Sequence, residues 1–111
     1  MRRSSGSYSH RMPYYYCKLV APRATFAQDM NEAETAAMQT HAAYWQERTT
    51  TTEVLAVGLV GHPAGAFGVA ILGAGSDAEL AALLYADPAM TAAVGLRYET
   101  YPMPLGRVIH S

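Results

Sequence analysis

The stretch that decides the fold is residues 53–85, EVLAVGLVGHPAGAFGVAILGAGSDAELAALLY. Two apolar runs rich in β-branched residues, 53–60 and 67–72, lie on either side of a loop that contains glycine and proline. This arrangement predicts a β-hairpin with a fairly long loop. A helix is expected over 76–85, because its leucines recur at helical spacing. The stretch therefore predicts the order strand, strand, helix.

Capping signals and apolar spacing predict two helices. Ser76 and Glu79 form a capping-box pair at the start of the helix just described, and Asn31 and Glu34 form a similar pair ahead of a longer helix over 32–48. The apolar stripe of the shorter helix consists of Leu80, Leu83 and Leu84. One face of the longer helix carries Ala37, Met38, His41, Tyr44, Trp45 and Arg48.

Two further strands are predicted outside this central part. Residues 14–20 are aromatic and β-branched, and residues 21–30 after them are predicted to form a loop. A last strand is expected over 96–101, ended by Pro102 and Pro104. The full order, strand, helix, strand, strand, helix, strand, is typical of a ferredoxin-like α+β fold.

This βαββαβ order places both helices on one face of a four-stranded antiparallel sheet. The other face would be left uncovered, which is costly for apolar side chains in water. A second copy of the chain is the simplest cover, so the sequence predicts a homodimer.

Composition limits the class of protein. The 111 residues are 50% hydrophobic and 15% charged with a net charge of -1, so we expect one folded domain over 13–111 and no nucleic-acid partner. Residues 1–12 are rich in serine, glycine and arginine and are predicted to be a flexible tail. No apolar run is long enough for a membrane span. Cys17 is the only cysteine, which fits a reducing cytoplasm.

His41 and Asp87 are the candidate catalytic residues. His41 lies on the sheet-facing side of the longer helix, and Asp87 ends the shorter helix on the same face of the sheet. An aspartate that accepts from one imidazole nitrogen fixes the tautomer and leaves the other nitrogen as a base. The alternative is a histidine that only packs between helix and sheet.

Other polar and aromatic residues admit two interpretations. The ring of Tyr16 either stacks on an aromatic substrate or belongs to a core or dimer interface. Arg23 either binds a carboxylate or phenolate or is simply solvated. His62 and His110 have spacings that match no known metal-ligand motif, so no metal or other cofactor is expected.

The residues resemble a known family, the YciI-like (YCII-related) domains. The resemblance extends over nearly everything after Met12 and is carried by PRATFAQDM at 22–30, Glu32, Glu34, Met38, His41, Tyr44, Trp45, Gly58, PAGAFG at 63–68, Asp87-Pro88 and Pro102-Met103. It implies a ferredoxin-like domain that dimerises through its sheet into an α+β barrel. It also implies an active site built on a His41–Asp87 dyad.

We therefore expect a small cytoplasmic enzyme that performs general acid–base proton transfer, as in isomerisation or elimination. Its substrate would be a small cyclic or aromatic compound, bound by Tyr16, Arg23, Tyr44 and Trp45. The first alternative is a non-catalytic dimer that binds a small molecule. The second is a purely structural dimer in which His41 only packs.

Overall fold

The computed structural model describes residues 13–49 and 53–104. The predicted tail at 1–12, the threonines at 50–52 and His110 lie outside the described residues. The elements in chain order are β1 (Tyr14–Val20), α1 (Phe26–Asp29), α2 (Glu32–Arg48), β2 (Val54–Val60), β3 (Phe67–Gly73), α3 (Asp77–Tyr85), α4 (Pro88–Thr91) and β4 (Arg97–Met103).

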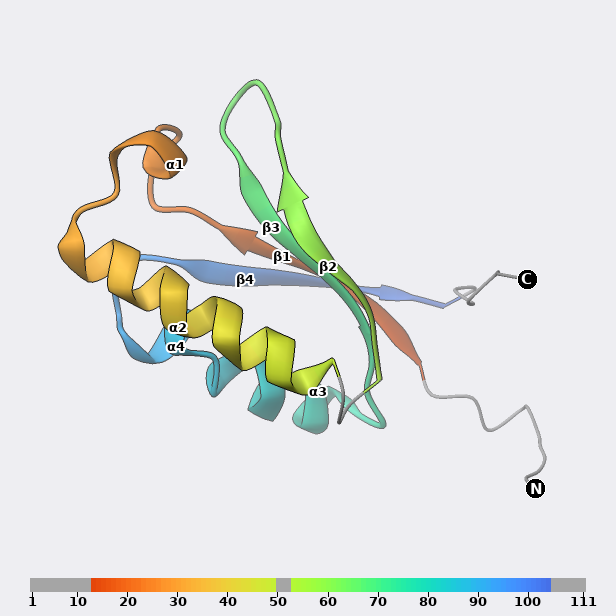
Figure 1. Ribbon diagram of the computed structural model, residues 1–111. Helices are drawn as coiled ribbons and strands as arrows, with labels where there is room; N and C mark the ends of the chain where they lie inside the picture. Colours follow the sequence, from red (N-terminus) through yellow and green to blue (C-terminus); the bar gives the residue numbers. More distant parts are fainter. Residues whose placement is uncertain (1–12, 50–52, 105–111) are drawn as a thin grey trace.

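The four strands form one antiparallel sheet in the order β2-β3-β1-β4. The helices α2, α3 and α4 lie together on one side of this sheet (Figure 1). The architecture is α+β and compatible with the predicted ferredoxin-like plan, in which the two central strands are β1 and β3. No helix or strand of the described part covers the opposite face of the sheet (Figure 1).

The predicted number of helices is wrong, since the described residues contain four. The loop predicted over 21–30 contains α1, whose Phe26 is buried and so anchors this short turn. Asp87 and Pro88 do not simply end α3 but begin α4: Asp87 is its N-cap and Pro88 its first residue. Proline fits there because the first helical residues need no N–H donor.

The predicted end of the last strand is also wrong. β4 continues through Pro102 to Met103, because it is an edge strand that pairs with β1 only. A proline on an edge strand can turn its nitrogen outward, where no ladder hydrogen bond is lost. The hairpin strands β2 and β3 agree with their predicted ranges to within one residue at each end.

The helix caps follow the predicted signals in part. The capping box of α2 is confirmed, with reciprocal hydrogen bonds between Asn31 and Glu34. In α3 the side chain of Ser76 accepts from the Glu79 N–H at 3.1 Å, as expected. The Glu79 carboxylate, however, accepts from the Gly75 N–H at 2.8 Å and not from Ser76, so that half of the predicted box is wrong.

The core lies between the sheet and the helices. Alternation along β1 places Tyr15, Cys17 and Leu19 toward the helices. Buried residues from the other elements pack against them, namely Trp45, Ala70, Leu72, Ala74, Leu80 and Leu84. The predicted faces of both long helices are therefore confirmed, since Trp45, Leu80 and Leu84 come from them. Within 13–49 and 53–104, no helix is long and apolar enough to cross a membrane.

Candidate functional site

Asp87 is the centre of a buried hydrogen-bond network. Its side chain has no exposed surface, and it lies at the N-cap of α4, where Oδ1 accepts from the Ala89 N–H at 2.8 Å. Oδ2 accepts from Trp45 Nε1 at 2.8 Å and from the Tyr98 hydroxyl at 2.5 Å. His41 Nδ1 lies 3.0 Å from Oδ1 and 2.8 Å from Oδ2. Four donors from α2, α4 and β4 thus surround one carboxylate.

The network keeps Asp87 ionised. Burial alone would raise the pKa of its carboxyl, but the hydrogen bonds from His41, Tyr98, Ala89 and Trp45 outweigh burial and lower the pKa. Burial and the hydrogen bond to Asp87 raise the pKa of Tyr98. Tyr98 is therefore a neutral donor, and Asp87 is a carboxylate that only accepts.

This geometry determines the tautomer of neutral His41. A carboxylate accepts and cannot donate, so the proton of the neutral ring belongs on Nδ1. Nε2 then carries a lone pair, and it has no hydrogen-bond partner among the described residues. The side chain of His41 is 19% exposed, which leaves one edge of the ring accessible. The predicted contact between His41 and Asp87 is thus confirmed, while its catalytic role stays a prediction.

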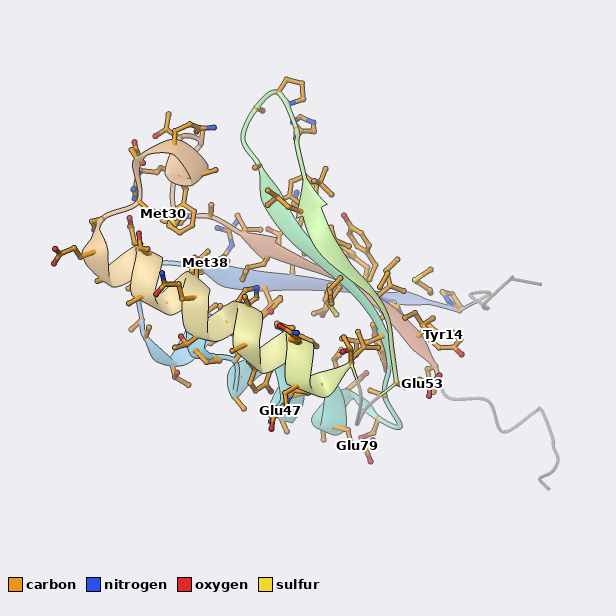
Figure 2. All side chains as sticks on the ribbon, viewed as in Figure 1. Tyr14, Met30, Met38, Glu47, Glu53 and Glu79 are labelled. Atoms are coloured by element: carbon orange, nitrogen blue, oxygen red, sulfur yellow. The ribbon has the colours of Figure 1, made fainter. Side chains whose placement is uncertain are left out.

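A cavity of about 640 Å³ lies beside this network. Its lining residues come mainly from α1, α2 and the β2–β3 hairpin. These elements face one another in Figure 1. Three members of the network, His41, Trp45 and Tyr98, line it. Met30 and Met38, labelled in Figure 2, line it from the side of the helices. Its volume falls in the range of about 300–1,000 Å³ that is typical of small-molecule sites.

Two predicted site residues, Tyr44 and Trp45, lie next to each other in α2. Trp45 lines the cavity and donates to Asp87. Tyr44 is not part of the cavity wall. Its hydroxyl donates to the Leu83 carbonyl at 2.5 Å, and its ring lies edge-on to Trp45 with centroids 5.4 Å apart. Tyr44 therefore supports Trp45 from the side of α3.

The other two predicted binding residues lie away from the cavity. The register of β1 places Tyr16 on the uncovered face of the sheet, where its ring lies 6.0 Å from that of Tyr101. Arg23 forms a bidentate ion pair with Glu34, with both N–O distances 2.8 Å, and also binds Asp29. It borders a second, smaller cavity of about 310 Å³. Binding roles for Tyr16 and Arg23 stay predictions, at places separate from His41.

Sequence reasoning missed two residues of these networks. Tyr98 donates to Asp87 and lines the cavity, and the alternation of Leu96 and Tyr98 in the predicted last strand was the available signal. The capping pattern predicts the role of Glu34 as a cap but not its role as the buried partner of Arg23. The Arg23 guanidinium and then the Asn31 N–H lower the pKa of Glu34 to about 2.

The described residues contain no group of three or more histidine, cysteine, aspartate or glutamate side chains able to hold a metal ion. The side chains of the site itself offer one imidazole nitrogen, a buried carboxylate and neutral donors. No family model, curated protein or solved structure matches the chain.

Proposed function

We propose that the chain is a small acid–base enzyme whose active site is the cavity beside His41. The observation that carries the proposal is the hydrogen bond between His41 Nδ1 and the buried Asp87 carboxylate, at the wall of a cavity large enough for a small molecule. An imidazole held in one tautomer at the wall of an apolar cavity is suited to proton transfer at carbon or oxygen.

His41 is the proposed catalytic residue. Its Nε2 atom takes a proton from the ligand, and the same nitrogen then returns a proton to another position of the ligand or to a leaving group. Asp87 is a positioning residue that holds the Nδ1 proton and places its negative charge against the ring while the ring is protonated. Trp45 and Tyr98 hold the carboxylate in turn. The cycle ends with His41 in its starting state, so isomerisation needs no cofactor.

The substrate is proposed to be a small cyclic or aromatic compound. Apolar side chains form most of the cavity wall, and the face of the wall next to His41 includes the indole of Trp45. Gln46, the residue after Trp45 in α2, adds a neutral amide that can donate to a substrate oxygen. A flat apolar ring would bury its surface between these groups while its acidic C–H meets Nε2.

The YciI-like resemblance, a sheet-to-sheet homodimer forming an α+β barrel and a cytoplasmic location belong to the same proposal. What supports the dimer is the uncovered face of the sheet. The strand register places Tyr16, Val69, Ile71 and Tyr101 on it, together with the cross-strand neighbours Lys18 and Glu99. Apolar and aromatic side chains gathered on one face favour burial against a partner.

Deuterium exchange into 2-tetralone tests the function, because this neutral ketone carries an acidic benzylic C–H. The wild-type chain is expected to accelerate exchange in deuterated water, His41→Gln to abolish the acceleration, and His62→Gln, which changes a histidine of the hairpin loop, to retain it. Removal of one general base reduces rates by roughly 10²–10⁴-fold. Binding of the ketone without any exchange would contradict catalysis and favour the non-catalytic binding dimer.

A further inference from the structure

We infer that the cavity beside His41 takes an electrically neutral ligand and rejects carboxylates and phosphates. The inference rests on the proposed function, because it names the substrate class of the same site. It is argued from the types of side chain on the cavity wall and from the hydrogen bonds that the polar groups there already make.

The cavity wall carries no lysine, arginine, aspartate or glutamate among the residues that the structure describes. The polar or titratable side chains on it are His41, Trp45, Gln46, Thr49 and Tyr98. The rest of the wall is apolar or glycine and includes Leu19, Phe26, Met30, Met38 and Leu59. An anion moved from water into such a space loses its hydration without gaining a counter-ion.

The donors nearest to His41 are already used. The indole N–H of Trp45 and the hydroxyl of Tyr98 both donate to Asp87. The carboxylate of Asp87, kept ionised by these bonds, also places a negative charge directly behind His41, Trp45 and Tyr98 on the cavity wall. A protonated His41 would be paired with that charge and would leave no net positive charge for a second anion. The network therefore opposes an anionic ligand instead of attracting one.

The basic side chains of β1 and of the loop after it lie away from the cavity of His41. Arg23 is held by Glu34 and Asp29 and borders the smaller cavity. Lys18 borders that same cavity, and its ammonium group lies 4.5 Å from the centroid of the Phe67 ring. Neither residue lines the cavity of His41. The positive charges of β1 and of the loop that follows it therefore border the smaller cavity and not the cavity of His41.

Paired probes test the inference by isothermal titration at neutral pH. The first pair of probes is 2-tetralone and its charged counterpart 1,2,3,4-tetrahydro-2-naphthoate. A panel of neutral bicyclic lactones and phenols follows, each paired with a carboxylate of the same ring system. Chemical shifts of the indole N–H of Trp45, the only tryptophan, report whether binding occurs in this cavity. Each neutral compound is expected to bind at least about tenfold more tightly than its carboxylate.

A second experiment introduces a positive charge at the cavity wall. Ala42 lines the cavity from α2, whereas its exposed neighbour Ala43 does not. Ala42→Arg is expected to strengthen binding of the carboxylate by about tenfold or more, and Ala43→Arg to leave it unchanged. Both substitutions add a good helix former to an exposed part of α2, so both variants should fold.

Equal or tighter binding of the carboxylates by the wild-type chain would overturn the inference, as would binding of none of the neutral compounds. These outcomes differ from a failure of the proposed function. A neutral ketone that binds beside Trp45 but undergoes no His41-dependent exchange would refute catalysis and leave the ligand class intact.

Discussion

Nδ1 of His41 lies 2.8 Å from Oδ2 of Asp87, although 46 positions separate the two residues. The contact joins the middle of α2 to the N-cap of α4, and it places an ionised carboxylate behind an imidazole that borders a cavity. Because the carboxylate is fully buried and holds three other donors, it cannot turn away from His41 without leaving buried polar groups unpaired.

Asp87→Asn tests the role of the carboxylate. The amide nitrogen of asparagine would meet donors from His41, Trp45 and Tyr98, so at least one buried donor loses its acceptor. We expect a loss of about 1–3 kcal/mol in the free energy of unfolding, measured in urea. Exchange into 2-tetralone should fall by roughly 10²–10⁴-fold, because His41 would no longer be held with its proton on Nδ1. Unchanged exchange in a folded variant would refute the positioning role.

Glu34→Gln tests the ion pair with Arg23 through its pH dependence. The pKa of Glu34 is about 2 in the folded chain and 4.5 ordinarily, so the carboxylate stabilises the fold above pH 4.5. This contribution is lost as the pH falls from 4.5 toward 2. The free energy of unfolding, measured in urea at several pH values, should fall less between pH 4.5 and about 2 for Glu34→Gln than for the wild type. Glu32→Gln, at an exposed position of the same helix turn, is the control and should keep the wild-type decline.

Cys17 should be inert in the native chain. Its side chain is fully buried in β1, and burial raises the pKa of the thiol to about 11. Almost no reactive thiolate therefore exists near neutral pH, and reagents cannot reach it. An aromatic disulfide reagent is expected to label Cys17 only after unfolding in urea. With Cys17 replaced by alanine, a cysteine introduced by Ala43→Cys should react at once. Rapid labelling of native Cys17 would contradict the described packing of β1.

Two exposed tyrosines test the proposed dimer. Tyr101 is 50% exposed on the uncovered face of the sheet, and Tyr85 is 68% exposed on α3 in the other layer. Light scattering is expected to give the mass of a dimer for the wild type and for Tyr85→Asp. Tyr101→Asp should give a monomer, because the charge would lose its water on assembly. A monomeric wild type, or dissociation caused by Tyr85→Asp alone, would refute assembly through the sheet.

The order of the four strands and the two longer helices along the chain was predictable from the sequence. The capping box at Asn31 and the alternation of β1, for example, are local signals. The pairing of His41 with Asp87 was also predictable, since both were placed on one face of the sheet. The turn at Phe26 was not, because burial by distant residues holds it. The hydrogen bond from Tyr98 to Asp87 and the Arg23–Glu34 ion pair depend on contacts across elements, and local patterns do not specify such partners.

The most direct test of the dyad is the tautomer of His41, measured by nitrogen NMR on the imidazole at about pH 9, where a histidine ring is ordinarily neutral. The account predicts a protonated Nδ1 and a Nε2 that carries the lone pair, with this preference weakened in Asp87→Asn. A neutral ring protonated on Nε2 in the wild type would contradict the account, because Nδ1 could then not donate to Asp87 and Nε2 could not act as the base.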